Sequence, residues 1–346
     1  MFGPVVIWSL RAALALALLA TPATPALAQG GATSVVVIRD AETETLLRNF
    51  ANPLFRAAGL EPNSVRIILI RDDALNAFVS TGNRLFINSG IIAKSESALE
   101  LIGVLAHETG HIRGGHIARL PEMMREAMIK SVAAMLIGAA AATAGRNPEA
   151  GMGAILGGQH LAMRGMMSFT RGMENAADQS ALLVLDRVGW SARGLLGLFR
   201  RVRDQDALVD EMQDPYLRTH PMTRDRIDVV TAHIANSPHA NAKLPARFET
   251  DFQLVRAKLR GFLEPSSLTL RRVRETDPAP DARYARAIAL YRLGHADPAL
   301  KLLDGLLAET PASPGLHELK GQILFEAGRG AAALAPYREA DRKSVV

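Results

Sequence analysis

Residues 101–116 read LIGVLAHETGHIRGGH, and this run places a His-Glu-x-x-His motif, at 107–111, on one predicted helix. Ser97 followed by Glu100 is a capping-box signature for the start of that helix, and the Gly114-Gly115 pair predicts its end. Two residues four positions apart lie one turn above each other, so both imidazoles can reach a single ion at about 2.0–2.1 Å. The motif therefore predicts a zinc site.

Glu108 lies about 100° round the helix from His107, so it can flank an ion without being one of its ligands. A carboxylate at that place can take a proton from a zinc-bound water, whose pKa is lowered to about 7, while the zinc polarises a peptide carbonyl. The alternative is a chance motif on a surface helix. Apolar Leu101, Val104 and Leu105 on the opposite side instead predict a buried helix, in which two histidines and a glutamate need partners. We therefore interpret the motif as a metallopeptidase centre with Glu108 as the general base.

The third protein ligand has to come from elsewhere in the chain. The pattern H-E-x-x-H-x-x-G-x-x-H would place a histidine at position 117, but Ile stands there, and His116 comes one residue early, about 100° away. We therefore interpret His116 as a polar residue at the helix end. The stretch TRGMENAAD, at 170–178, offers Glu174, which would complete a His₂Glu set and leave a fourth position for water or substrate. Asp178 would then accept the free ring N–H of a ligand histidine. The alternative for both carboxylates is an ordinary solvated helix face.

Three stretches in this order resemble the signatures of the HtpX and CAAX-prenyl-protease-like zinc metallopeptidases: HETGH at 107–111, TRGMENAAD at 170–178 and HPMTRDRI at 220–227. Upstream, Asn76-Ala77-Phe78 and Asn88-Ser89-Gly90 also match the strand region of that family. The resemblance covers residues 35–260, and it is closest to the periplasmic BepA type, whose members carry C-terminal tetratricopeptide repeats. Thr170 stands where the family usually has Ser, which is a mild departure.

The resemblance implies a zincin-like domain that binds one zinc ion per chain. By the same resemblance, His107, His111 and Glu174 would be the metal ligands and Glu108 the base. His220 would be a switchable fourth ligand that blocks the water site in a resting state.

On its residues alone, the segment 214–221 is a loop, because two prolines exclude a continuous helix there. Without the resemblance, His220 would be interpreted as a surface histidine. Arg226 and Tyr216 are both candidate donors to a developing oxyanion, and the sequence does not choose between them.

Residues 1–28 have the composition of a cleavable secretory signal, with one basic residue, Arg11, the apolar run 12–20 and the small-residue site Ala26-Leu27-Ala28. The mature chain is expected to begin at Gln29 in the periplasm. The sequence contains no cysteine, which excludes lipid attachment after the cleavage point and any disulfide.

The formal net charge of the sequence is +5, with basic and acidic residues interleaved and 5% aromatic residues. Because no run of like charge is present, this composition gives nucleic-acid binding little support. A weak attraction to anionic membrane surfaces, and hence peripheral membrane contact, is compatible with it.

The segment before the zinc helix is predicted to form a helix, 40–58, followed by a small sheet of three short strands at 65–70, 75–80 and 84–87. The edge strand of such a sheet can hold a peptide substrate by main-chain hydrogen bonds. Asn76, Ala77 and Phe78 are the candidate edge. Plain hairpin packing is the alternative for these three residues.

Residues 120–168 contain an apolar run, 131–144, that is too short to span a bilayer, followed by a segment rich in glycine and methionine. One interpretation is a pair of small-residue helices packed against the zinc helix. The other is a flexible lid or membrane-facing flap beside the site, because glycine permits hinges and methionine adapts to varied apolar surfaces. His160 has no partner at ligand spacing and is interpreted as structural.

Residues 266–346 repeat at a shift of 34 positions, which superposes Ala287 on Gly321 and Gly294 on Gly328. That period is typical of tetratricopeptide repeats, of which about two are present, the second incomplete. Two repeats without a cap would dock on the peptidase domain, or the chain is shorter than its relatives. In the family that the sequence resembles, such repeats contact the outer-membrane protein assembly machinery.

These features predict an α+β, mainly helical fold, with a zincin-like metallopeptidase domain at 29–265, a small sheet before the HExxH helix, and all-α tetratricopeptide repeats at 266–346. The predicted function is that of a periplasmic zinc metalloendopeptidase acting on unfolded, misfolded or stalled envelope and outer-membrane proteins. The alternative is a chaperone-like assembly factor with a latched peptidase site that acts through its repeats. An integral-membrane peptidase is disfavoured, because no apolar run after residue 28 is long enough to span.

Overall fold

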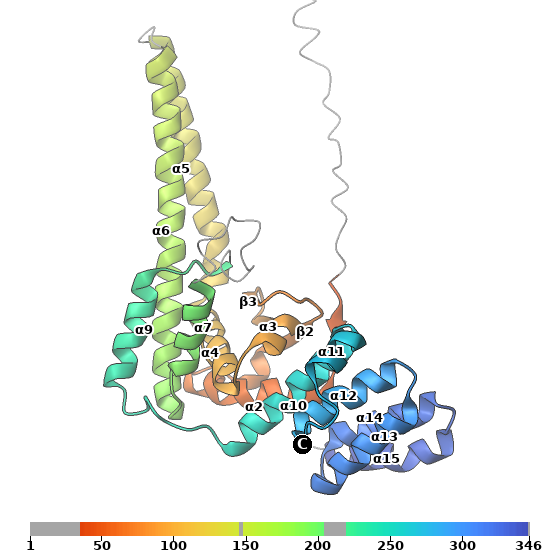
Figure 1. Ribbon diagram of the computed structural model, residues 1–346. Coiled ribbons are helices and arrows are strands. Elements are labelled where there is room, and N and C mark those ends of the chain that lie inside the picture. The colour runs from red at the N-terminus through yellow and green to blue at the C-terminus, as the bar shows by residue number, and fades with distance from the viewer. Residues whose placement is uncertain (1–34, 145–147, 204–218, 345–346) are drawn as a thin grey trace, which may run out of the picture. The chain divides into compact units, whose positions relative to one another are not determined.

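The computed structural model describes residues 35–144, 148–203 and 219–344, and within them the chain is mainly helical with one small sheet (Figure 1). The predicted signal peptide at 1–28, the expected mature start Gln29 and Tyr216 lie outside the described residues. The sheet precedes the HExxH helix in the chain, so the predicted α+β, mainly helical class is confirmed.

The sheet has four strands in the order β1-β2-β4-β3. β2 (Arg66–Ile70) and β4 (Arg84–Asn88) run parallel, while β1 (Val37–Ile38) and β3 (Ala77–Ser80) are antiparallel edge strands. The sequence predicts β2, β3 and β4 but not β1, because two residues are too few to display an alternating pattern. Ala77 and Phe78 lie on an edge strand, as predicted, and Asn76 directly precedes it.

The helix that carries the HExxH motif is α4 (Ala98–Gly114), and its two ends follow the predicted signals. The Ser97 hydroxyl accepts a hydrogen bond from the Glu100 N–H at 3.3 Å, and Gly115 takes a left-handed φ of 59° that ends the helix. The Glu100 carboxylate accepts a hydrogen bond from the Glu96 N–H, one residue before the N–H of Ser97 that a standard capping box would use. Leu101, Val104 and Leu105 are fully buried, which confirms that α4 is a core helix.

Two glycines bring neighbouring helices directly against α4. A Cβ on Gly103 would lie 2.6 Å from the backbone nitrogen of Leu195 in α7 (Arg193–Arg203). A Cβ on Gly110 would lie 2.5 Å from the carbonyl oxygen of Ala177 in α6 (Pro148–Val188). Neither place has room for a side chain, so the backbones of α6 and α7 pass close to the motif.

The two longest helices, α5 (His116–Ala144) and α6, pack side by side as an antiparallel pair (Figure 1). The described residues between 120 and 168 are helical, as the first interpretation predicts. Through most of this segment, however, the two helices pack on each other and not on α4, so the predicted packing against the zinc helix is wrong there. Only the C-terminal part of α6 enters the core, where Ala181, Leu182 and Leu185 are buried.

Buried apolar side chains form two clusters. The first lies around the sheet, α4, α6 and α7, and is completed by α2 (Ala41–Ala57), α3 (Ser89–Lys94), α9 (Arg224–Asn236) and α10 (Ala246–Leu263). The second lies in the C-terminal helices α12 (Pro280–Arg292), α13 (Ala296–Glu309), α14 (Pro314–Glu326) and α15 (Gly330–Ser344). The short helix α11 (Ser266–Arg272) precedes α12, and a 3₁₀ turn, η1 (Pro62–Ser64), precedes β2. The tetratricopeptide assignment and the boundary at 265/266 stay predictions.

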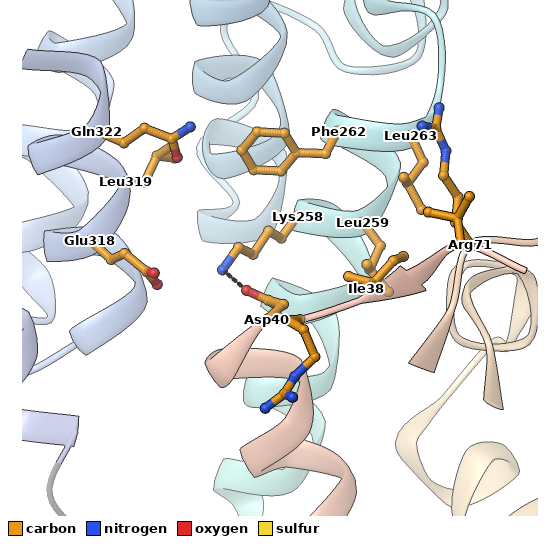
Figure 2. A pocket seen from close by; sticks show the side chains of 12 residues that line it. Ile38, Asp40, Arg71, Lys258, Leu259, Phe262, Leu263, Glu318, Leu319 and Gln322 are labelled. Atoms are coloured by element: carbon orange, nitrogen blue, oxygen red, sulfur yellow. Dashed lines mark hydrogen bonds and ion pairs between the residues drawn. The ribbon is translucent and has the colours of Figure 1, made fainter. Parts of the chain in front are cut away.

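A pocket of about 380 Å³ lies where β1, α10 and α14 meet (Figure 2). It has apolar walls, to which Leu259 and Leu319 contribute, and a charged pair, Asp40 and Lys258, at its side. The pocket shares no residue with the HExxH motif. Among the described residues, no helix combines the length and the apolar composition that crossing a membrane requires.

Candidate metal centre

Four buried side chains from three parts of the chain converge beside α4. His107 and His111 come from α4, Glu174 from α6, and His220 from the segment just before α9. Each offers one ligand atom, and the four atoms lie within 4.8 Å of one another. This group could hold a metal ion, and it unites all four metal ligands that the sequence and its family resemblance indicate.

Several of the separations between the ligand atoms are close to the edges of a small tetrahedral site. The Nε2 atoms of His107 and His111 are 3.1 Å apart, and each lies 3.3 Å from a carboxylate oxygen of Glu174. His220 Nδ1 lies 3.3 Å from His107 Nε2 and 3.2 Å from Glu174 Oε2. A tetrahedron with ligand distances of about 2.0–2.1 Å has edges of about 3.3–3.4 Å, so these separations are close to the edges of a zinc site. The donor set of three imidazole nitrogens and one carboxylate fits zinc in number and type.

Each histidine of the group has a different partner at its outer ring nitrogen. His107 Nδ1 donates to Asp178 Oδ1 at 2.8 Å, as predicted for Asp178. His220 Nε2 donates to the carbonyl oxygen of Ala77 at 3.3 Å. His111 Nδ1 lies 3.0 Å from His116 Nδ1. Such outer partners hold a ligand ring in one orientation and one tautomer.

His116 is more than the polar helix-end residue that the sequence predicts. Its side chain is buried and contacts His111 directly, because the left-handed turn at Gly115 directs the first residue of α5 back toward α4. Sequence reasoning missed this contact, since helical periodicity does not extend across a break. The signal that could have found it is a histidine placed directly after a Gly-Gly helix end.

Arg226 is the second residue whose role the sequence left open. Its guanidinium is buried and donates to both carboxylate oxygens of Asp178, at 2.6 and 2.9 Å. It also lies 3.0 Å from Glu174 Oε2 and donates to the carbonyl oxygen of Pro221 at 2.8 Å. Because these contacts direct the guanidinium at two carboxylates, the geometry favours a positioning role for Arg226 over donation to an oxyanion.

Glu108 is fully buried, and neither of its carboxylate oxygens has a hydrogen-bond partner among the described residues. His220 Nε2 lies 3.5 Å from Oε1, too far for a hydrogen bond of ordinary strength. Burial raises the pKa of Glu108 above its usual value, although the charges of His220 and His107 oppose this rise. A buried carboxylate without partners is costly, and such groups concentrate at functional sites.

The pKa values of the two stacked histidines move in opposite directions. Burial would lower the pKa of His107, but the carboxylates of Asp178 and Glu174 raise it to about 10. Burial lowers the pKa of His111 to about 3, despite its contact with Glu174. For Glu174, burial would raise the pKa, but the three surrounding histidines hold it far below its usual value. The carboxylate is therefore ionised at neutral pH, as a metal ligand must be.

The predicted substrate-binding residues lie next to this group. The buried Asn76 accepts a hydrogen bond from the Thr219 hydroxyl at 3.3 Å, and the Ala77 carbonyl contacts His220. Phe78 stacks on Phe86 across the β3–β4 pair, with ring centroids 5.0 Å apart. The structure thus places the start of the edge strand beside the metal group, while Phe78 points to the neighbouring strand.

The chain is similar in sequence to known proteins that are named as proteases. Beta-barrel assembly-enhancing protease of Yersinia pestis is 28% identical over 310 residues, which are 86% of this chain and 62% of the relative. The protein of that name in Escherichia coli (strain K12) is 28% identical over 292 residues, 81% of this chain and 58% of the relative. Mitochondrial metalloendopeptidase OMA1 of Schizosaccharomyces pombe is 27% identical over 180 residues, 50% of this chain and 48% of the relative.

The chain spans about three fifths of the length of the assembly-enhancing proteases that it matches. A model of one peptidase family, M48, matches residues 39–234, which is more than half of the chain. This range contains α4, the four side chains that could hold a metal ion, Glu108 and the edge strand β3. The chain therefore belongs to peptidase family M48.

Proposed function

We propose that this chain is a zinc-dependent metalloendopeptidase of the periplasm that hydrolyses peptide bonds in misfolded or stalled envelope and outer-membrane proteins. One observation carries the proposal. The ligand atoms of His107, His111, Glu174 and His220 converge within 4.8 Å, directly beside a buried carboxylate, Glu108, that has no hydrogen-bond partner of its own among the described residues.

In this proposal His107, His111 and Glu174 hold one zinc ion per chain. When bound, zinc supplies Lewis-acid polarisation of a peptide carbonyl and lowers the pKa of a water molecule to about 7. Glu108 accepts the proton of the attacking water on its unpaired carboxylate and returns it to the nitrogen of the leaving amine. Asp178 holds the His107 ring, and Arg226 holds the carboxylates of Glu174 and Asp178.

The edge strand supports an extended peptide substrate. β3 is an edge of the sheet, and the Ala77 carbonyl at its start lies within hydrogen-bond distance of the metal group. An extended chain bound there would use main-chain hydrogen bonds, which do not depend on side-chain identity. Such binding suits segments that have lost or not yet reached their fold. The names of the assembly-enhancing relatives support outer-membrane proteins as the substrate class.

The periplasmic location rests on the leader-like composition of residues 1–28. The C-terminal helices α12 to α15 are proposed to be tetratricopeptide repeats that contact the outer-membrane protein assembly machinery. Their two successive helix pairs support this assignment.

A second candidate function is that of a chaperone-like assembly factor with a latched peptidase site. His220 favours it, because this ring contributes a ligand atom to the metal group and also contacts the edge strand at Ala77. Thr219 extends the contact to Asn76. A segment bound in this way occupies both the fourth metal position and the start of the strand that a substrate would use.

The test of the proposed function is cleavage of a permanently unfolded polypeptide by zinc-loaded protein that begins at Gln29. The matched variant is Glu108→Gln, which keeps the size of the side chain but removes the proton acceptor. We expect fragments from the parent protein, none from the variant, and about one zinc per chain in both by metal analysis. Equal cleavage by the two proteins would show that Glu108 is not the base.

The latched alternative is tested by His220→Ala. If His220 blocks the site, this variant should cleave faster than the parent at equal zinc content. Slower or equal cleavage with unchanged zinc would remove the latch. Zinc binding without cleavage by either protein would leave the assembly-factor function as the better account.

A further inference from the structure

The outward surface of the α5–α6 hairpin is apolar along most of its length. Its large apolar side chains are between 39% and 67% exposed, and they are Met124, Met128, Ile129, Val132, Met135, Leu136 and Ile137 on α5, and Met152, Leu156, Met163 and Met167 on α6. Consecutive residues of a helix point about 100° apart, so Met135, Leu136 and Ile137 face three directions. A helix exposed to water normally keeps such residues on the face that packs against its neighbour.

The contact between the two helices does not account for these side chains. Along α5, the positions that are half-buried or buried recur every three or four residues, at Met123, Ala127, Ser131, Ala134 and Gly138. This spacing marks the face that packs on α6, and its small residues let the two backbones approach closely. The exposed apolar residues lie outside that face, and no described part of the chain covers them.

Charge is absent from the middle of the hairpin and present at its two ends. Between 131 and 163 the sequence has two charged residues, Arg146, which lies between α5 and α6 in the chain, and Glu149, the second residue of α6. Where the hairpin joins the core, basic residues outnumber acidic ones five to two: Arg119, Arg125, Lys130, Arg164 and Arg171 against Glu122 and Glu126. The end of the hairpin next to the metal centre is therefore net positive.

The length of the uncharged part decides how it can meet a membrane. The runs 131–144 and 150–163 have fourteen residues each, or about 21 Å of helix, whereas the hydrocarbon core of a bilayer is about 30 Å thick. Upright insertion would carry Glu149, near the start of α6, into the hydrocarbon. A hairpin lying along the interface, with its apolar side about 5–10 Å deep, keeps both charged ends at the level of the headgroups.

We propose that the α5–α6 hairpin is a peripheral membrane-binding element that lies in the interface of an anionic bilayer. The basic end supplies the attraction to anionic headgroups, and the exposed methionine, leucine and isoleucine side chains supply the apolar contact. Glu174 follows Arg171 by three residues on α6, so the metal centre is held close to the lipid surface. The proposal does not depend on peptidase activity.

The lack of cysteine in the chain permits a direct test with one environment-sensitive fluorophore. Leu136→Cys, made in the full mature chain with Glu108→Gln and labelled with a nitrobenzoxadiazole dye, is mixed with vesicles that contain phosphatidylglycerol. We expect a blue shift and a rise in emission. The matched control is Phe325→Cys on α14, where the native side chain is 65% exposed, and this position should show no change.

Co-sedimentation with the same vesicles measures the contribution of the surface. Leu136→Glu with Leu156→Glu should weaken vesicle binding about tenfold or more, because two apolar side chains that would leave water on binding are replaced by carboxylates. Phe325→Glu with Leu334→Glu removes two equally exposed apolar side chains elsewhere and should leave binding unchanged. Lys130→Ala with Arg164→Ala should weaken binding at low salt and remove the preference for anionic over zwitterionic vesicles.

Three results would overturn the proposal. The first is no vesicle binding by the parent chain, and the second is binding that the Leu136 and Leu156 changes leave intact. The third is a fluorescence change at position 136 with unfolded polypeptide but not with vesicles, which would make the hairpin a polypeptide-binding surface instead. Circular dichroism of each variant verifies that the helices are retained.

Discussion

Each histidine of the metal group has one ring nitrogen turned inward and one turned outward, and only one of the three outer partners is itself a histidine. His107 donates to a carboxylate and His220 to a backbone carbonyl, both of which accept in every protonation state expected at neutral pH. His116 can accept from His111 Nδ1 only through an unprotonated Nδ1, which burial favours by lowering the pKa of this ring. The orientation of His111 therefore depends on a neutral His116.

Replacing His116 tests that dependence. His116→Phe keeps most of the ring volume but removes the acceptor, and we expect the affinity for zinc to fall about 10- to 100-fold. His116→Gln restores an acceptor through its amide oxygen and should recover part of the loss. Competition with a chromophoric chelator measures the zinc affinity of each variant. The absorption bands of the cobalt-substituted protein report the ligand geometry. Equal affinities for the two variants would reduce His116 to a packing residue.

Arg226 is expected to matter for stability as well as for the site. Arg226→Met leaves the carboxylates of Asp178 and Glu174 buried without their cation, which should cost about 3–5 kcal/mol of unfolding free energy. Denaturant unfolding of the metal-free protein measures this loss. Arg224→Met, two residues away and exposed, is the matched control and should change stability by less than about 0.5 kcal/mol. If Arg226→Met also lowers stability by less than about 0.5 kcal/mol, the contacts of Arg226 with Asp178 and Glu174 contribute little to folding.

At the scale of secondary-structure elements, the metal group depends on the distance between α4 and α6. His107 and His111 belong to one helix and Glu174 to the other, and both helices approach where Gly110 meets the backbone at Ala177. A shift of the two helices apart by a few tenths of an ångström would move the carboxylate away from both imidazoles. The glycine within the motif therefore sets the geometry of the site without contacting a ligand.

Gly110→Ala is expected to disturb the site, because its Cβ would lie 2.5 Å from a carbonyl oxygen that cannot move alone. We expect a lower melting temperature and weaker zinc binding. Gly172→Ala on α6 is the matched control, since a Cβ there meets nothing within 4 Å and alanine favours the helix by up to about 1 kcal/mol. Gly110→Ala should fall below the parent in melting temperature and in zinc affinity, whereas Gly172→Ala should equal or exceed the parent in both.

At the scale of the whole molecule, a buried ion network connects the start of α2 with α10 and the C-terminal helices. Lys258 on α10 binds Asp40 at 2.5 Å and Glu42 at 3.0 Å, and Glu42 also accepts from the Tyr284 hydroxyl at 3.1 Å (Figure 2 shows the Lys258–Asp40 contact). The backbone of Gly315 in α14 packs directly on the Glu42 carboxylate. These contacts link the two clusters of buried side chains.

The pH dependence of stability should reveal this network. Burial alone would raise the pKa of Asp40, but Lys258 and hydrogen bonds lower it below the usual 3.8. A lowered carboxylate pKa contributes stability above the unfolded value, and this contribution is lost as the pH falls through the folded pKa. Burial would lower the pKa of Lys258, but Glu42 and Asp40 raise it, so its contribution is complete below 10.5 and is lost at higher pH.

Lys258→Met should therefore lower the unfolding free energy at pH 7 by about 1–3 kcal/mol, with the difference from the parent shrinking below about pH 4. Thermal unfolding of both proteins between pH 3 and pH 7 measures the difference between their unfolding free energies. Titration of the metal group affects both proteins equally, so it cancels in this difference. Lys243→Met, at an exposed lysine, should follow the parent at every pH. A constant gap between Lys258→Met and the parent would exclude Asp40 as the titrating group.

The features that could be predicted from the amino-acid sequence are those whose signals are local. The Ser97 cap, the helix end at Gly115, and the facing positions of His107 and His111 all depend on residues within a few turns of one another. Glu174 and Asp178 could be paired in advance because residues four apart share a helical face. The same logic predicted three of the four strands and the helices around them.

Contacts between residues far apart in the chain became visible in the folded molecule alone. Arg226 reaches Asp178 across 48 positions, His220 reaches Ala77 across 143, and Gly110 admits the backbone of α6. The hairpin could not be distinguished from core helices in advance, because an apolar helix has the same composition whether protein, lipid or nothing covers it. Periodicity describes one element at a time, whereas a contact is decided by which two elements fold together.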